Sequence, residues 1–217
     1  MLTNKRHRKI RTISLTLLSF LLILSLATTP SFAALMQTKS TKTVKLTGTY
    51  HQSDARKMSK MVNQFRTGKE AWYYTQSGSK QKVKKLKKLT YDYALEKVAM
   101  KRAAEIAVSF SHTRPNGKLC FSAFPSGYYW MGENIAYGTA FYMTPKKTLN
   151  LWKETNESYD GQGHRRNMLS RNYTSVGIAC FEYNGCKYWV QEFGAPRSNK
   201  AKTKACNSKK TVSVKVK

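Results

Sequence analysis

Residues 92–117 read DYALEKVAMKRAAEIAVSFSHTRPNG, and this stretch decides much of the fold. It predicts an α-helix over 92–110, with Asp92 or Thr90 as the N-cap and Pro115 and Asn-Gly beyond its end. Small and apolar side chains recur at helical spacing along one face: Leu95, Val98, Ala99, Arg102, Ala103, Ile106, Ala107 and Phe110. Because the alanines make this face narrow, another layer can approach it closely, and we expect a central helix.

Further elements lie on both sides of this helix. Ser53 can cap a helix that ends at Gly68, and Thr144 can cap another that has Pro145 at its first position and runs to about Ser158. Two segments with strand-like arms around a turn predict hairpins, residues 71–83 and 175–194. Helices that alternate with antiparallel strands indicate an α+β fold in which helices cover a central sheet.

The two ends of the chain have a different composition. Five basic residues precede an apolar run over 13–27, and Ser31-Phe32-Ala33 follows, so we expect a signal peptide over residues 1–33. An uncleaved anchor is the alternative, but the run is shorter than the roughly 20 residues of a membrane span. Residues 34–52 are predicted to be an extended lead-in. Residues 197–217 are predicted to be a basic tail, in which the alternation of Thr211–Val216 also fits a marginal strand.

Charge limits the classes of partner. The formal net charge is +28, and removal of the leader lowers it to +23. Such an excess favours anionic lipid or cell-envelope polymer, although a merely solubilising surface is equally compatible with it. The sequence contains no recognised nucleic-acid-reading motif, and we expect no nucleic acid partner. It also contains no second long apolar run, so we expect no integral membrane protein after cleavage.

Cysteine spacing leaves the pairing open. The four cysteines are Cys120, Cys180, Cys186 and Cys206, which allow three pairings. Cys180 and Cys186 flank the turn signal Asn184-Gly185, and alternation along a strand would place them on opposite sides, so a bridge between them is not expected. No CxxC pair or Cys/His zinc spacing is present, and the sequence does not predict a thiolate metal site.

Dense motifs follow one another in a fixed order. They are SHTRPNG at 111–117, Gly132-Glu133-Asn134, WKETNE at 152–157, GQGHRRNML at 161–169 and YWVQEF at 188–193. We expect the two histidine motifs and the Gly-Glu-Asn motif to lie in loops. Over residues 53–196 this order resembles the CAP superfamily of cysteine-rich secretory proteins, antigen 5 and plant pathogenesis-related proteins, in its bacterial branch. The resemblance implies a three-layer α-β-α sandwich with an antiparallel sheet and a large cleft, in which two His and two Glu form a tetrad.

Motif positions assign the members of that tetrad. His112, Glu133 and His164 match three of them. The place of the fourth is occupied by Thr155, with Glu154 and Glu157 on either side. Glu154 is favoured, because Glu157 could instead form a solvated helix pair with Lys153.

Two imidazoles and two carboxylates can bind a divalent cation or exchange protons. His112, His164 and Glu133 are the candidate ligands of Zn²⁺ or another divalent cation, and a carboxylate can instead orient a ligating His. A polar network that only orders loops is the remaining alternative.

The leading interpretation is a secreted, non-catalytic CAP-domain protein that binds a ligand or cation and meets anionic envelope components, in association with the cell wall. A metal- or His-dependent, peptidase-like hydrolase and a structural interaction module of the cell wall or extracellular matrix are the alternatives. No catalytic residue is assigned, because no nucleophile elbow, H-E-x-x-H helix or nucleotide-binding loop occurs.

Six aromatic residues lie around the Gly-Glu-Asn motif: Tyr128, Tyr129, Trp130, Tyr137, Phe141 and Tyr142. We expect them to pack in the core or at its rim. A groove for a small lipophilic ligand or a glycan is the alternative.

Cleavage after Ala33 is the first prediction. N-terminal sequencing of the secreted protein should begin at Ala34, because small residues occupy the two recognition positions before that bond. Recovery of the intact leader in a membrane fraction would contradict it.

Overall fold

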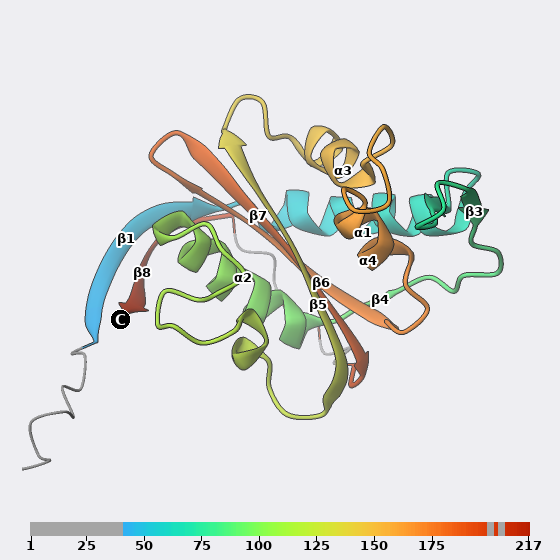
Figure 1. Cartoon of the computed structure of the whole chain (residues 1–217). Helices are drawn as coiled ribbons and strands as arrows, with labels where there is room; N and C mark the ends of the chain where they lie inside the picture. The colour runs from blue at the N-terminus through green and yellow to red at the C-terminus, as the bar shows by residue number, and fades with distance from the viewer. Residues whose placement is uncertain (1–40, 199–201, 204–206) are drawn as a thin grey trace, which may run out of the picture. The chain divides into compact units, whose positions relative to one another are not determined.

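The computed structural model describes residues 41–198, 202–203 and 207–217 (Figure 1). The proposed signal peptide, the first residues of the lead-in and Cys206 lie outside the described residues. In chain order the elements are β1 Lys42–Tyr50, α1 Gln52–Thr67, β2 Trp72–Tyr74, β3 Lys80–Lys82, β4 Thr90–Tyr91, α2 Tyr93–Val108, the 3₁₀ helix η2 Cys120–Ala123, β5 Tyr128–Thr139, α3 Pro145–Lys153, α4 Gly163–Leu169, β6 Ser175–Tyr183, β7 Cys186–Pro196 and β8 Lys209–Val216.

The strands form one main sheet. Its order is β5-β7-β6-β1-β8, with antiparallel neighbours, and the short β4 pairs in parallel with the start of β6. β5 and β8 are therefore the two edges. β2 and β3 form a separate two-stranded hairpin, as the sequence predicted for 71–83. No helix in the described part of the chain is long and apolar enough to cross a membrane.

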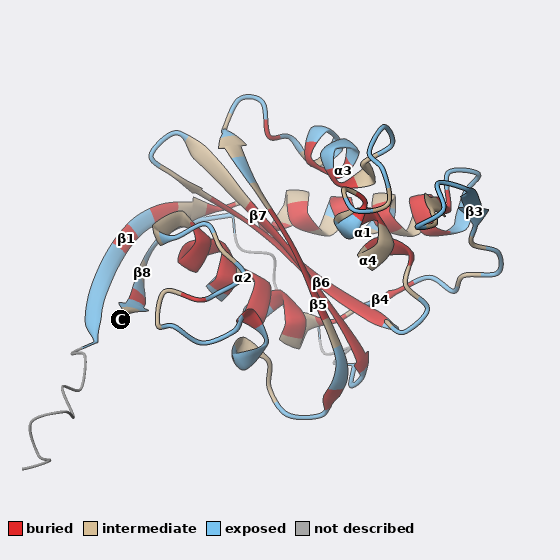
Figure 2. Ribbon diagram, viewed as in Figure 1, coloured by how far each residue is buried: buried red, intermediate tan, exposed pale blue. Residues whose placement is uncertain are grey.

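Helices cover both faces of the main sheet. Alternation along β6 directs Val176, Ile178 and Cys180 into a core shared with α1, α3 and α4. Ala179 and Phe181 enter a second core under α2. The buried residues accordingly follow the central strands and the sheet-facing sides of the helices (Figure 2). This is the expected α+β fold, a three-layer α-β-α sandwich.

α2 is a central helix, as its narrow face predicted. The Asp92 carboxylate caps it by accepting from the backbone N–H groups of Ala94 and Leu95. Ala99 and Ala103 are wholly buried. The closest approach is at Gly177 of β6, where an added Cβ would lie 2.1 Å from the backbone nitrogen of Glu96. The helix therefore packs backbone against backbone at this point.

The chain ends contribute more to the sheet than the sequence predicted. Within the expected lead-in, residues 42–50 form β1. Within the expected basic tail, β8 extends the marginal strand at 211–216 to 209–216 and pairs with β1 from Lys42↔Val216 to Thr49↔Lys209. Each strand is short of apolar residues, and the partner lies at the other end of the chain, so neither segment carries a local signal for this pairing.

Four local expectations need correction. α1 begins at Gln52, so Ser53 is not its cap. α3 ends at Lys153 rather than near Ser158, because Glu154 adopts a left-handed conformation with φ 45°. The Gly-Glu-Asn motif lies inside β5 and is not a loop. The second histidine motif, expected as a loop, forms the short helix α4.

The close contact between α2 and β6 gives the second prediction. Gly177→Ala should destabilise the protein by about 2–3 kcal/mol, because the new methyl group meets fixed backbone. Gly163→Ala is the matched control, since nothing lies within 4 Å of its added Cβ, and it should be neutral or slightly stabilising. Urea unfolding of both variants measures the difference, and equal midpoints would contradict the packing argument.

Candidate functional site

The first histidine is presented by an ordered loop after α2. The His112 carbonyl accepts from the Cys120 amide (2.9 Å), and the amide of Arg114 donates to the Lys118 carbonyl (2.8 Å). Gly117 closes the turn between them with φ 82°, which a side chain would strain. The Pro-Asn-Gly part of the motif thus builds a turn that returns the chain to His112.

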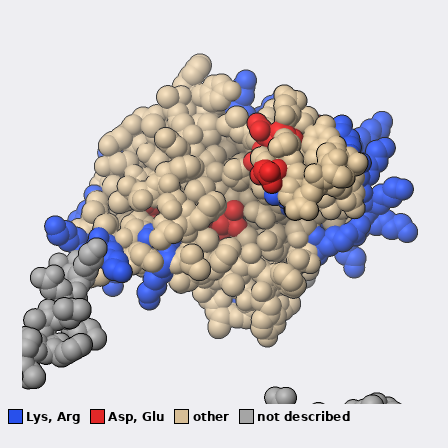
Figure 3. All heavy atoms as spheres, in the orientation of Figure 1, with Lys and Arg blue, Asp and Glu red and all other residues tan. Residues whose placement is uncertain are grey.

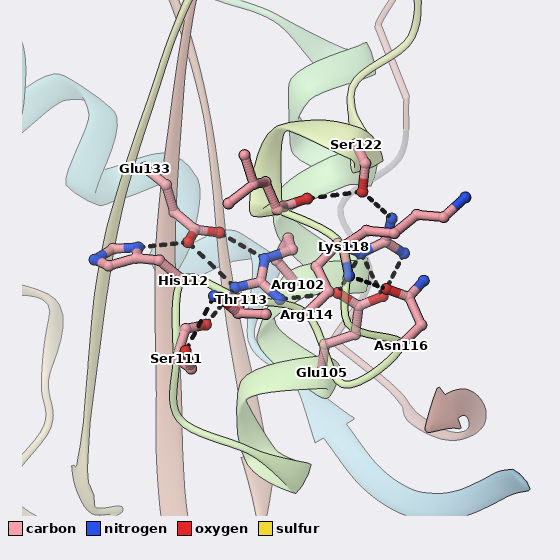
Figure 4. A network of polar contacts seen from close by, with 11 residues as sticks. Arg102, Glu105, Ser111, His112, Thr113, Arg114, Asn116, Lys118, Ser122 and Glu133 are labelled. Atoms are coloured by element: carbon pink, nitrogen blue, oxygen red, sulfur yellow. Dashed lines mark hydrogen bonds and ion pairs between the residues drawn. The ribbon is translucent and has the colours of Figure 1, made fainter. Parts of the chain in front are cut away.

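A buried ion-pair network lies beneath this loop (Figure 4). Arg102 of α2 is wholly buried and donates to Glu133 on β5 (2.6 Å from Nε) and to Glu105 (2.9 Å from Nη1). It also donates to the Ser111 carbonyl (2.7 Å). Arg114 donates to both Glu105 oxygens, with 2.7 Å from Nη2 to Oε1 and 2.9 Å from Nε to Oε2. The positive charges of the two guanidinium groups are therefore balanced by the negative charges of the two carboxylates.

His112 joins this network through one ring nitrogen. Its Nδ1 lies 2.8 Å from Glu133 Oε1. Burial raises the pKa of Glu133, but hydrogen bonds from His112 and Arg102 outweigh it and hold that pKa below its usual value. A carboxylate only accepts, so Nδ1 carries the proton and the lone pair of a neutral ring is on Nε2. The His112 side chain is 57% exposed and Glu133 only 1%, so Nε2 is directed away from the buried carboxylate.

Two buried groups beside Glu133 were not predicted from the sequence. Glu192 on β7 pairs in register with Glu133, is wholly buried, and has no hydrogen-bond partner among the described residues for either carboxylate oxygen. Burial, and then the charge of Glu133, raise its pKa well above the usual value. Cys120 is also buried, and its burial together with these two carboxylates raises the pKa of its thiol to about 12.

The second histidine is paired in the same manner. Nδ1 of His164 on α4 hydrogen-bonds Glu154 Oε1, and the other Glu154 oxygen accepts from the Arg165 amide (3.1 Å). The left-handed conformation of Glu154 ends α3 and turns the chain toward α4. The Gln162 side chain donates to the backbone carbonyl of Glu154 (3.0 Å). Arg165 is wholly buried against Trp72, with its guanidinium 3.9 Å from the ring centroid, and holds α4 in place.

Three side chains connect α3, α4 and the loop before β6 to the edge strand. The carbonyl groups of alternate β5 residues accept from Tyr173 Oη (Met131, 3.2 Å), Asn167 Nδ2 (Glu133, 3.3 Å) and Trp152 Nε1 (Ile135, 3.2 Å). In addition, Asn134 donates to the His164 carbonyl (3.2 Å). The Glu133 side chain points toward α2 and the Asn134 side chain toward α4, as alternation along a strand requires.

The predicted tetrad is therefore arranged as two hydrogen-bonded pairs. His112 is paired with Glu133, and His164 with Glu154. Within the described part of the chain, one set of three His, Cys, Asp or Glu side chains has its ligand atoms within 4.8 Å of one another, and it consists of His112, Cys120 and Glu133. The sequence did not predict a thiol here, because Cys120 is close to the carboxylate only through the fold.

The alternative fourth member is differently placed. Glu157 is exposed in the loop before α4 and lines a polar hollow with Tyr74 and Asn156. The helix pair that Glu157 could have formed with Lys153 is not present. Lys153 instead contacts Glu70 at 2.7 Å, because α3 ends before Glu157.

The aromatic residues of β5 and its flanks are mostly exposed. Tyr128 alone is buried, where its hydroxyl donates to Asp92 (2.6 Å). The other five are between 49% and 97% exposed: Tyr129, Trp130, Tyr137, Phe141 and Tyr142. The expectation of packing in the core or at its rim is correct for Tyr128, which is in the core, and for Tyr137, whose ring stacks on Tyr188 with 5.9 Å between centroids.

Comparison with known proteins is consistent with the order of motifs. Residues 60–193 match the Cysteine-rich secretory protein family, CAP. YkwD of Bacillus subtilis (strain 168), described as an uncharacterized protein, is 30% identical over 113 residues, which are 50% of this chain and 40% of YkwD. The aligned part of the chain thus spans less than half of that relative.

Solved structures give similar matches. NaASP2 with Zn²⁺ is 22% identical, with 64% of this chain and 78% of that chain covered and a TM-score of 0.48. A cysteine-rich secretory protein from Staphylococcus aureus, SAV1118, is 15% identical, with 66% of this chain and 38% of that chain covered and a TM-score of 0.41.

The buried Glu192 gives the third prediction. Its raised pKa means that the unfolded chain ionises at lower pH than the folded protein, so Glu192 lowers stability progressively as pH rises above about 4.5. Every tenfold difference between the acid dissociation constants of the two states corresponds to about 1.4 kcal/mol once the pH exceeds both pKa values. Glu192→Gln should therefore resemble the wild type near pH 4 and exceed its melting temperature at pH 7–8.

The exposed Glu157→Gln variant is the control, for which no such divergence with pH is expected. Thermal unfolding of the three proteins across pH 4–8 makes the comparison. A constant difference between Glu192→Gln and the wild type at all pH values would show that the raised pKa does not govern stability.

Proposed function

The chain belongs to the cysteine-rich secretory protein (CAP) family, and we propose that it binds a divalent cation such as Zn²⁺ through His112 and His164, without catalysing a reaction. The observation that carries the proposal is the use of Nδ1 in both rings. Each Nδ1 is engaged by a carboxylate, Glu133 or Glu154, which leaves Nε2 of each ring without a hydrogen bond to any described residue.

This arrangement fits a cation site. Carboxylates that accept from one ring nitrogen of histidine fix its tautomer and make the other nitrogen a better ligand. Glu133 is already neutralised by Arg102, so it suits the orienting role more than direct ligation. A bound Zn²⁺ would supply a Lewis acid at this place.

Cys120 offers an alternative third ligand. Its thiol is near His112 and Glu133, and its raised pKa keeps it protonated at neutral pH. Ligation by Cys120 would therefore release a proton when the cation binds. The contribution of Cys120 can be separated from that of His164, because Cys120 lies in η2 and His164 in α4, and each can be replaced alone.

We further propose that the protein acts outside the cell, in association with anionic envelope polymers or lipids. Support comes from the leader-like residues 1–33 and from the excess of lysine and arginine in the remainder. The exposed aromatic residues at the two ends of β5 are where a small lipophilic ligand would make contact.

The fourth prediction tests the cation site. In calorimetric titrations at pH 7.5, His112→Ala and His164→Ala should each abolish the Zn²⁺ binding shown by the wild type. Glu154→Gln and Glu133→Gln should weaken it by roughly 10–100-fold, as expected for groups that orient a ligand. Affinity should fall when the solution is acidified, because a protonated imidazole has no free lone pair.

Controls separate the alternatives. Glu157→Gln should bind like the wild type. If the ion is held by His112, Cys120 and Glu133 instead, Cys120→Ser weakens binding and His164→Ala does not. Absence of Zn²⁺ binding by the wild type contradicts the proposal. Turnover of a peptide or ester panel that is lost on chelation and in both His variants would establish the hydrolase instead.

A further inference from the structure

A second charged feature is a segment that contains none of the histidines. Residues 80–88, KQKVKKLKK, carry six lysines, all exposed, and connect β3 to the residues before β4. We call this segment the lysine strap. Figure 3 shows Lys and Arg side chains gathered at the end of the molecule where Figure 1 labels β3, while the Asp and Glu side chains visible on this face lie mainly elsewhere.

Apolar residues anchor the strap to the protein. Val83 and Leu86 pack against the core formed with α1, α3 and α4, and Leu89, three residues further on, is buried within it. Apolar side chains at every third position turn inward. The pairs Lys84-Lys85 and Lys87-Lys88 between them remain exposed. The lysines therefore protrude from a fixed support.

The backbone of the strap is also held. The amide of Val83 donates to the Ala71 carbonyl (2.8 Å), and Asn63 makes hydrogen bonds to both the amide and the carbonyl of Leu89 (2.7 and 2.9 Å). Arginine side chains donate to two of its carbonyls, Arg171 to Lys84 (2.6 Å) and Arg66 to Lys87 (3.2 Å from Nη2). The conformational cost of ordering this segment is thus largely met before any ligand binds.

Two hollows flank the strap and share Arg66, Lys85 and Leu86. Their volumes are about 600 and 500 Å³, and no Asp or Glu lines either of them. Arg66 is buried, its hydrogen bonds go to carbonyl groups rather than carboxylates, and burial lowers its pKa to about 10. None of the ion pairs in the described part of the chain involves a lysine of the strap.

We propose that the lysine strap and its two hollows bind a linear polyanion with repeating phosphate groups. This rests on the proposed association with anionic envelope components and gives that association a location. A linear chain fits better than a membrane, because the apolar residues of the strap face inward and none is exposed for insertion into lipid. Paired lysines at a spacing of three residues match a ligand that carries charge at regular intervals.

The test uses long-chain linear polyphosphate and the full secreted protein, with binding followed by calorimetry at several salt concentrations. The strap variant combines Lys84→Gln, Lys85→Gln, Lys87→Gln and Lys88→Gln. The matched control combines Lys42→Gln, Lys45→Gln, Lys209→Gln and Lys210→Gln, four exposed lysines of β1 and β8. Both variants have the same net charge, and both keep side chains of similar length.

The strap variant should lose roughly 100- to 1,000-fold in affinity, as expected when about four cationic contacts are removed. The slope of log affinity against log salt concentration should become less negative by about 3. Each phosphate contact on a single-stranded polyanion contributes about 0.7 to this slope, and about four contacts are lost. The control should stay within a few fold of the wild type.

If both variants lose affinity for polyphosphate equally, the lysine strap is not the binding site, and the attraction is due to the net charge alone. A wild-type protein that does not bind polyphosphate would overturn the location and the proposed association with anionic polymers together. Salt-sensitive binding to anionic vesicles without binding to polyphosphate would replace the linear ligand with a lipid surface. None of these outcomes depends on Zn²⁺, so the cation site is tested separately.

Discussion

The buried guanidinium of Arg102 imposes the constraint on which the His112 part of the candidate site depends. A wholly buried guanidinium is tolerable only if anions and carbonyl groups surround it, and losing one partner of such a pair costs about 3–5 kcal/mol. Here the partners are Glu105 on the same helix, Glu133 on the edge strand and the Ser111 carbonyl in the histidine loop. One side chain therefore ties α2, β5 and the loop together, and the orientation of His112 follows from it.

The other histidine depends on a second constraint, the open edge of β5. Exposed strand edges invite pairing with other chains. In this protein Trp152, Asn167 and Tyr173 donate to three successive outward-facing carbonyl groups of that edge. These hydrogen bonds satisfy the edge and at the same time position α3 and α4 against it. Because Glu154 ends α3 and His164 lies on α4, the same contacts that protect the edge also hold the second His–Glu pair against β5.

Local patterns in the sequence predicted α2 and the β6–β7 hairpin, because helical spacing and an Asn-Gly turn act over a few residues. The pairing of β1 with β8 was beyond such reasoning, since it joins the two ends of the domain. The family resemblance predicted His112 and Glu133 as site residues. Arg102 was predicted to lie on the apolar face of its helix, where a charged residue indicates a buried partner of opposite charge, but that partner was not predicted. Cys120 and Glu192 acquire their roles only from neighbours that the fold brings to them.

Arginines and lysines occupy different places in this protein, and this difference explains why the lysine strap keeps its positive charge. Among the described residues four arginines are buried and no lysine is, as expected from the planar, multiply donating guanidinium and the strongly hydrated ammonium group. The chain has only 11 acidic residues, and most of them are engaged in ion pairs, caps or the buried network. Few remain to neutralise the surface. The lysines of the strap therefore keep a positive field, while the interior and the His–Glu site are balanced by their own partners.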